Sequence, residues 1–194
     1  IYSMKVIIDT NSLLSLVRYY LPFDKDKILY NFIKNKVQSG EIIIIDKVHQ
    51  QCSFISKGII LKELDFLDDK DFKKASKIPY NTELTIAPNT KKFFHLLNSV
   101  FVNSVVKKAK NITEVEFEIL KTSHLKDADM KLVLLALNFN TEEDVYIVTE
   151  ETSESNDNKL FVKIPAMCRE LGLKCITLPA LIKLYQDDFE LHFK

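Results

Sequence analysis

Four short apolar runs, separated by helical patterns, constrain the fold of this chain most strongly. They lie within residues 5–8, 41–46, 144–151 and 173–178. None shows the polar–apolar alternation of a half-exposed strand, and such runs are typical of strands buried on both faces of a parallel sheet. Because helical patterns alternate with them, we predict an α/β fold. Its central parallel β-sheet should have about four or five strands, with helices on both faces.

The helical patterns between the runs lie over residues 13–20, 21–40, 47–56, 61–77, 89–110, 111–123, 126–139 and 164–172. Side chains that favour helix N-termini precede several of these segments. The expected N-caps are Asn11 or Ser12, Asn89 or Thr90, and Thr113, with Glu116 completing a capping box at the last of these. No internal repeat or linker divides the pattern.

The length of 194 residues predicts one domain. We interpret residues 1–4 as a cloning remnant followed by the start methionine, and residues 5–194 as a single domain. The three cysteines are widely spaced, and the sequence has neither a signal peptide nor an apolar run long enough to cross a membrane. We therefore expect a cytoplasmic protein without a membrane partner.

The charge balance limits how the chain can bind nucleic acid. Lysine and arginine together number 27, as do aspartate and glutamate, so the formal net charge is zero. An RNA contact would need a local basic patch, and lysines gather at 73–77, 91–92 and 107–110, although helix-face lysines are usually just solvated. The sequence lacks a glycine-rich phosphate loop, and His49, Cys52, Cys168 and Cys175 lack zinc-site spacing.

Acidic residues occur where a site of a parallel sheet would form. Asp9 directly follows the first run, Glu150 and Glu151 end the third, and Asp127 and Asp129 begin the helix over 126–139. Ligands of open parallel sheets bind beyond the carboxyl ends of the strands. Taken singly, a helix-opening aspartate is usually an N-cap and a strand-end glutamate is usually solvated. Together, these carboxylates are suited to a hard cation such as Mg²⁺ or Mn²⁺.

The stretches that carry these acids resemble motifs of PIN-domain ribonucleases. "VIIDTNSLL" at 6–14 resembles the opening motif of that family, "DADMKLVLLAL" at 127–137 its third-acid helix, and "YIVTEE" at 146–151 its strand followed by T-x-D/E. The tail "VKIPAMCRELGLKCITLPAL" at 162–181 is similar to one prokaryotic PIN subgroup described only as a domain of unknown function. The matches occur in order over most of the chain, and the resemblance is weak between about 55 and 110.

The resemblance implies a metal-dependent endoribonuclease that hydrolyses RNA phosphodiester bonds. It assigns Asp9, Asp129 and Glu151 to one or two Mg²⁺ or Mn²⁺ ions, with Asn11 and Thr149 in supporting roles. The spacing to a small residue of the motif favours Asp129 over Asp127. Because many bacterial PIN proteins are toxins of toxin–antitoxin pairs, the resemblance also implies a toxin or defence role. The partners expected on that basis are RNA, a small antitoxin protein and a second copy of the chain in a homodimer.

Gln51 departs from the family's pattern. The second acid of the family usually ends a V-x-x-E sequence, and this register reads "VHQQ" at 48–51 here. Glutamine offers a carbonyl oxygen but no negative charge, and cation affinity depends on the number of carboxylates. Neither Glu63 nor Asp46 is in register to replace the missing acid. Three interpretations stay open: three acids suffice, the enzyme is weakened or inactive, or Gln51 is an engineered change.

Two other functions compete with the ribonuclease hypothesis. The first is a catalytically degenerate or deliberately inactivated PIN-like module that serves in binding or as a scaffold. The second is a 5′-nuclease-like enzyme acting on structured DNA. That class shares an acid-rich sheet edge, but its additional acids and helical arch are missing here, so we rank it last.

Overall fold

A four-stranded parallel sheet forms the centre of the computed structural model, which describes residues 4–152 and 158–190. The strands are β1 (Met4–Ile8), β2 (Ile42–Ile43), β3 (Asp144–Val148) and β4 (Lys174–Ile176). Their order in the sheet is β2-β1-β3-β4, and each neighbouring pair is parallel. The prediction of an α/β fold with a central parallel sheet is confirmed.

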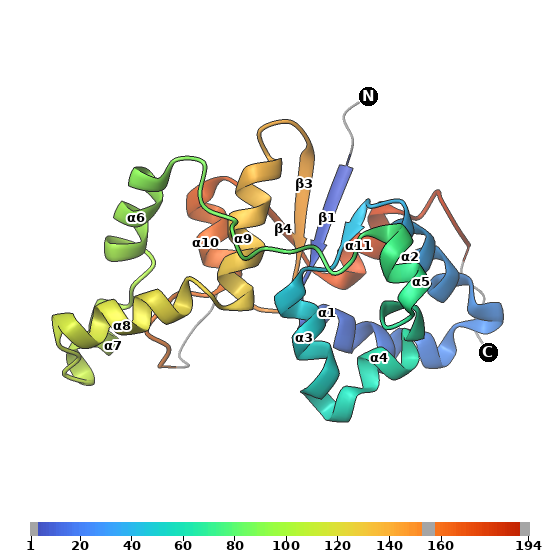
Figure 1. The fold of residues 1–194 in the computed structure, drawn as a ribbon, viewed down its shortest axis with the longest axis horizontal. Helices are drawn as coiled ribbons and strands as arrows, with labels where there is room; N and C mark the ends of the chain where they lie inside the picture. Colours follow the sequence, from blue (N-terminus) through green and yellow to red (C-terminus); the bar gives the residue numbers. More distant parts are fainter. Residues whose placement is uncertain (1–3, 153–157, 191–194) are drawn as a thin grey trace.

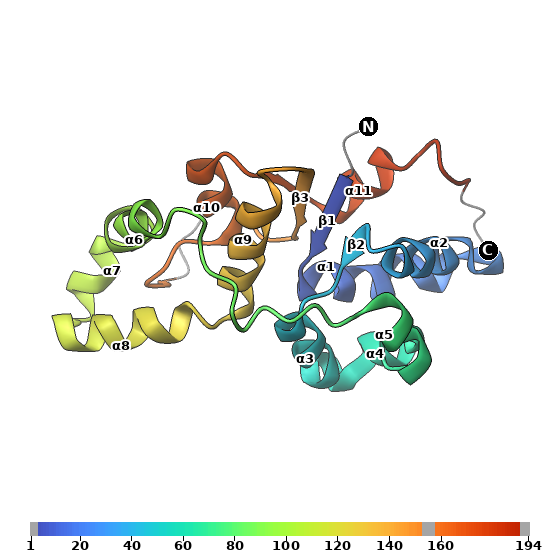
Figure 2. The same ribbon diagram turned by 45° about the horizontal axis from the view of Figure 1, so that its top comes forward.

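Helices cover the sheet and explain why its strands are apolar throughout. Figures 1 and 2 show α9 (Ala128–Phe139) and α10 (Ile164–Leu171) on one side of the strands, with α2 (Ile28–Gln38) and α11 (Leu178–Leu184) on the other. Side chains of the central strands are therefore removed from water on both faces. The fully buried ones include Val6, Ile7, Ile8, Ile147 and Val148.

The second strand is shorter than predicted. Only Ile42 and Ile43 pair with β1. The next two residues bond to Tyr80 instead, through a hydrogen bond from the Tyr80 amide to the Ile44 carbonyl and a bridge at Ile45. The chain then enters α3 (Asp46–Phe54), so the segment 44–45 leaves the sheet to pair with a connecting loop.

Two long predicted helices are interrupted by internal caps. The segment 61–77 divides into α4 (Ile59–Glu63) and α5 (Lys70–Ser76), and the segment 89–110 into α6 (Thr90–Ser99) and α7 (Ser104–Ala109). Asp69 accepts a hydrogen bond from the Phe72 amide at 2.7 Å, and Asn103 accepts from two amides of α7. Such side chains satisfy the free amides of a helix N-terminus, so each begins a new helix.

The predicted caps are confirmed at two helices and wrong at a third. Asn89 caps α6, and Thr113 with Glu116 forms the capping box of α8 (Glu114–His124). The first helix, α1 (Thr10–Ser15), is capped by Asp9 rather than by Asn11 or Ser12. Its start is therefore set by the same carboxylate that ends the first strand.

The remaining helical segments are short. A π-helical turn spans Leu16–Tyr20, and 3-10 turns span Leu21–Phe23, Lys25–Lys27, Ile55–Gly58 and Asp65–Leu67. The helix α11 follows the last predicted strand, where no helix was expected. Within the ranges 4–152 and 158–190, no helix is long and apolar enough to span a membrane.

Helices α6, α7 and α8 form an arm that projects from the side of the molecule that carries α9 and α10 (Figure 1). The arm is joined to the segment 158–162 by backbone hydrogen bonds. The Asn103 amide donates to the Leu160 carbonyl at 2.7 Å, and the Val162 amide donates to the Phe101 carbonyl at 3.0 Å. The arm thereby fixes the course of the segment 158–162.

Lys131 holds the loop before the arm against α9. Its side chain is buried, and its ammonium donates to the carbonyls of Thr82 at 2.8 Å, Glu83 at 3.2 Å and Thr85 at 3.2 Å. We expect Lys131→Met to lower the free energy of unfolding by about 2–3 kcal/mol, because the buried bond to the Thr82 carbonyl and two partly buried bonds are lost. Urea denaturation measures this change. An exposed control, Lys91→Met, should stay within about 0.5 kcal/mol of the parent; an equal loss in both variants would contradict the prediction.

Candidate metal and nuclease site

The candidate site lies at the carboxyl ends of β1 and β3, the two neighbouring strands from which the chain continues to opposite sides of the sheet. From β1 the chain proceeds to β2 on one side, and from β3 it proceeds to β4 on the other, while β1 and β3 are neighbours. Open parallel sheets bind ligands at such a switch point, beyond the carboxyl ends of the strands. Asp9 directly follows β1, and Thr149 directly follows β3. Both residues therefore stand at the edge where a ligand would be expected.

Asp9 is a buried carboxylate, with 5% of the residue exposed. One oxygen, Oδ1, accepts a hydrogen bond from the Thr10 amide at 2.6 Å, and Oδ2 accepts from the Thr149 hydroxyl at 2.9 Å. Burial and the charge of Asp129 raise the pKa of Asp9 to about 7, against the lowering effect of these hydrogen bonds. No lysine, arginine or histidine of the described residues forms an ion pair with it. Its negative charge is therefore desolvated without a matching positive charge.

Asn11 and Thr149 link the ends of the two central strands. The Thr149 hydroxyl lies 3.4 Å from Asn11 Oδ1, which also accepts a hydrogen bond from the Glu150 amide at 3.1 Å. The Glu151 amide in turn donates to the Thr149 hydroxyl oxygen at 3.2 Å. These bonds hold Asp9 in one orientation and fix the backbone that carries Glu151.

Of the two aspartates at the start of α9, Asp129 is the one that interacts with Asp9. Its own pKa is raised, first by burial and then by the charge of Glu151. Asp127 occupies the N-cap position of α9 but makes no capping bond, and its carboxylate lies 3.3 Å from His124 Nδ1. Among the described residues, none donates a hydrogen bond to the Asp129 carboxylate. Asp129 is thus a half-buried acid that accepts no hydrogen bond from the part of the chain that the structure describes.

The two consecutive glutamates after β3 accept hydrogen bonds from different helices. Glu150 Oε1 accepts from the Leu178 amide at 2.7 Å, at the first residue of α11, and lies 3.3 Å from the Ser12 hydroxyl. Glu151 Oε2 accepts from the Ile164 amide at 3.2 Å, at the first residue of α10. Only Glu151 raises the pKa values of both Asp9 and Asp129. The structure therefore brings Glu151, and not Glu150, into the electrostatic environment of the two aspartates.

Gln51 reaches the same region from α3. Its side-chain carbonyl accepts a hydrogen bond from the Thr10 hydroxyl, while the Thr10 amide bonds to Asp9. The possible replacements for Gln51 lie elsewhere. Asp46 bonds to the Thr82 hydroxyl and the Lys47 amide, and Glu63 lines a separate cavity. Gln51 is therefore linked to Asp9 through Thr10, and its neighbour in α3, Cys52, also feels the charge of Asp9.

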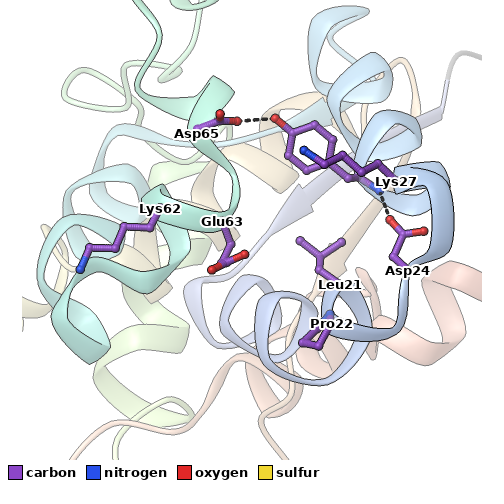
Figure 3. A pocket seen from close by; sticks show the side chains of 8 residues that line it. Leu21, Pro22, Asp24, Lys27, Lys62, Glu63 and Asp65 are labelled. Carbon is purple, nitrogen blue, oxygen red and sulfur yellow. Dashed lines mark hydrogen bonds between the residues drawn. The ribbon is translucent and has the colours of Figure 1, made fainter. Parts of the chain in front are cut away.

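The cavity that contains Glu63 has a volume of about 340 Å³. Figure 3 shows the Glu63 carboxylate extending into the space in front of Leu21 and Pro22, with Lys62 pointing away from them. The cavity is further lined by Asp24, Lys27, Tyr30 and Asp65. The buried Asp24 carboxylate accepts hydrogen bonds from the amides of Leu29 and Tyr30. Asp24 has a structural role at the start of α2, because both of its carboxylate oxygens accept hydrogen bonds from amides of that helix.

The predicted site residues offer oxygen donors, which are three carboxylates and the Gln51 carbonyl, while the Cys52 and Cys175 thiols lie close enough for the charge of Asp9 to act on them. This donor chemistry fits a hard cation such as Mg²⁺ or Mn²⁺ in kind. The side chains nevertheless bond to different groups: Asp9 to Thr149, Glu151 to the Ile164 amide, and Gln51 to Thr10. In the described ranges of the chain, no three His, Cys, Asp or Glu side chains are gathered into a group that could hold a metal ion. A cation held by these residues would therefore require a change of side-chain rotamer, first of all at Glu151.

Two residues near the acids were missed by sequence reasoning. Lys159 Nζ lies 3.7 Å from Glu151 Oε1, and its charge lowers the pKa of Asp129. His124 stacks on Phe161 with ring centroids 4.2 Å apart, and its buried Nε2 has no hydrogen-bond partner among the described residues. Both come from segments without a recognisable motif. No local signal in the sequence connects them to Asp129.

Comparison with known proteins identifies a family without adding a function. A family model described as "Domain of unknown function (DUF4411)" matches residues 85–189, which include Asp129, Thr149 and Glu151 but not Asp9, Asn11 or Gln51. No curated protein and no solved structure matches the chain. Since the matched region covers more than half of the sequence, the chain belongs to the DUF4411 family.

Proposed function

We propose that this protein is a metal-dependent endoribonuclease of the PIN type. The observation that carries the proposal is the buried carboxylate of Asp9 at the sheet edge, which forms no ion pair with a described residue. Asp9 is buried, its pKa is raised to about 7, and Asp129 and Glu151 both contribute to that rise. Repulsion among the three carboxylates at this switch point disfavours their ionised forms, although Asp9 and Glu151 also accept hydrogen bonds from helix N-termini. A divalent cation would relieve that repulsion, which supports a metal site there.

Each residue of the site has a distinct role in this proposal. Asp9, Asp129 and Glu151 would hold one or two Mg²⁺ or Mn²⁺ ions. When bound, such a cation supplies a water molecule of lowered pKa as the attacking group and offsets the charge that builds on the phosphate oxygens. Asn11 and Thr149 keep the acids oriented through their hydrogen bonds. The N-terminus of α9, which carries Asp129, adds a favourable dipole for an anionic substrate.

The proposal is tested by incubating the purified protein with a generic single-stranded RNA and Mn²⁺ or Mg²⁺. We expect fragments that carry 5′-phosphate and 3′-hydroxyl ends, and we expect EDTA to stop the reaction. Asp129→Asn should abolish cleavage without loss of the folded state, because no described residue depends on that carboxylate for a hydrogen bond. Cleavage that continues in the variant would contradict the assignment of Asp129.

Cation binding should release a proton in a pH-dependent manner. Asp9 has a pKa of about 7 in the folded protein, so it is largely protonated at pH 6 and ionised at pH 8.5. A cation binds the ionised form, and we expect close to one proton to be released at pH 6 and almost none from Asp9 at pH 8.5. Mn²⁺ affinity should therefore rise between these pH values. Titration calorimetry in buffers of different ionisation enthalpy measures the release, and equal values at both pH values would contradict the prediction.

The biological role follows the same proposal. RNA is the substrate, a small antitoxin protein is the partner that restrains the enzyme, and a homodimer is the proposed assembly. Expression of the chain in a bacterial host should slow growth if it is a toxin. Co-expression of a small open reading frame that neighbours its gene should then restore growth.

A binding or scaffold module is the second candidate function. It is favoured by Gln51, which is neutral, and by the helix-capping contacts of Glu150 and Glu151. In that case the glutamates serve the starts of α11 and α10, and the protein binds its partner without cleaving RNA. Absence of both Mn²⁺ binding and cleavage would support this alternative.

A further inference from the structure

Lys159 forms a loose and accessible ion pair with Glu151. The distance between Lys159 Nζ and Glu151 Oε1 is 3.7 Å, too long for a hydrogen bond, and the lysine side chain is 55% exposed while that of Glu151 is 15% exposed. An ion pair that lacks a hydrogen bond and whose lysine side chain is exposed adds little to stability. The ammonium is therefore easily exchanged for another cation at Glu151, and it can be reached from solvent.

The position of Lys159 is nevertheless set by the arm. The residue before it, Asn158, accepts a hydrogen bond from Lys110 Nζ through its carbonyl at 3.0 Å. The residue after it, Leu160, accepts from the Asn103 amide. Phe161 packs against His124 of the same arm. The backbone on both sides of Lys159 is thus anchored to α7, α8 and their connections, which keeps a flexible side chain close to the acids.

We propose that Lys159 binds a substrate phosphate at this site, after a divalent cation has displaced its ammonium from Glu151. The inference rests on the proposed nuclease function. A divalent cation and the Lys159 ammonium would compete for the Glu151 carboxylate, so the binding of either one weakens the binding of the other. The displaced ammonium remains within reach of the acids because the backbone on both sides of Lys159 is anchored to the arm. A phosphate that approaches the cation would then meet a second positive charge beside it.

The test compares Lys159→Gln with a matched control at the opposite edge of the sheet. Lys174 is 52% exposed and pairs with Asp144 at the starts of β4 and β3. Lys174→Gln therefore removes the same charge from a similarly exposed lysine far from the carboxyl edge. Lys159→Arg retains the charge, and thermal melting verifies that each variant is folded.

Two binding constants are measured for each protein. Calorimetry gives the Mn²⁺ affinity, and fluorescence anisotropy in Mn²⁺ gives the affinity for a single-stranded phosphorothioate RNA, whose integrity is checked on a gel. We expect Lys159→Gln to bind Mn²⁺ about threefold to tenfold more tightly, because the competing ammonium is gone. We expect it to bind the RNA several-fold more weakly, with the slope of log affinity against log salt reduced by about 0.7. Lys174→Gln should match the parent, and Lys159→Arg should retain the RNA affinity.

Three results would overturn the inference. If Lys159→Gln behaves like Lys174→Gln in both titrations, Lys159 is an ordinary surface lysine. If Mn²⁺ binding tightens while RNA binding stays unchanged, Lys159 is a counter-ion of Glu151 and does not contact substrate. If the parent protein binds neither Mn²⁺ nor RNA, the nuclease proposal itself fails, and that outcome is distinguished by the parent alone.

Discussion

Asp9→Asn is expected to raise the free energy of unfolding above pH 7 and to abolish divalent-cation binding. In the folded protein the pKa of Asp9 is about 7, against an ordinary value of 3.8. Between pH 4 and pH 7 the folded state therefore holds more protons than the unfolded state, and the stability of the parent falls as the pH rises. Above pH 7 both states are ionised, and the full penalty of the buried charge remains.

The size of this penalty follows from the pKa shift. A rise from 3.8 to about 7 corresponds to about 4 kcal/mol as an upper limit. Asparagine can still accept from the Thr10 amide, and its amide group can donate to the Thr149 oxygen. We therefore expect a net gain of about 1–3 kcal/mol at pH 8. The gain should vanish near pH 4, where Asp9 is neutral in the folded parent.

Asp24→Asn provides the matched control. Asp24 is 8% exposed and Asp9 is 5% exposed, so both substitutions are made at buried aspartates. The two oxygens of Asp24 accept the amides of Leu29 and Tyr30 at 3.0 and 2.9 Å, and asparagine can replace only one of these acceptors. We expect a loss of about 1–2 kcal/mol for Asp24→Asn. If urea denaturation at pH 8 shows the same loss for Asp9→Asn, then the ionised Asp9 carboxylate stabilises the fold and the prediction is wrong.

Gln51→Glu is expected to increase Mn²⁺ affinity by about tenfold or more, since cation affinity depends on the number of carboxylates. The introduced carboxylate can still accept the hydrogen bond from the Thr10 hydroxyl, so we expect the local structure to be unchanged. It adds a negative charge beside Asp9 and should raise the pKa of Asp9 further. The variant should therefore be less stable than the parent at pH 8 without Mn²⁺, and more strongly stabilised when Mn²⁺ is added.

Gln50→Glu tests whether position or charge alone produces the effect. Gln50 precedes Gln51 in α3 and is exposed to solvent, so the same substitution there adds a charge away from Asp9. We expect no change in Mn²⁺ affinity for Gln50→Glu. Cation binding and RNA cleavage by the parent would mean that three acids suffice. RNA cleavage that appears only in Gln51→Glu would mean that the site is inactivated by the neutral residue at position 51. The absence of Mn²⁺ binding and of RNA cleavage in all variants would favour the binding module.

Several parts of the fold could be predicted because they depend on local sequence. Apolar runs without alternation identified the strands β1 and β3, and the Thr113–Glu116 capping box of α8 was predicted from four consecutive residues. The interruptions at Asp69 and Asn103 were missed, although both are good capping residues. Helical periodicity continues across them, so only the folded chain reveals which capping residue begins a new helix.

The sequence by itself determined a parallel α/β fold with acids at the carboxyl ends of its strands. Both signals are local, because a strand buried on both faces and a helix start are each recognised from a few consecutive residues. The tertiary structure decided which acids interact. It separated Glu151 from Glu150, set Gln51 beside Thr10, and brought Lys159 to within 3.7 Å of Glu151. Electrostatic interaction depends on distance through space and on shared burial. Neither can be read from the order of residues, since the groups concerned come from separate parts of the chain.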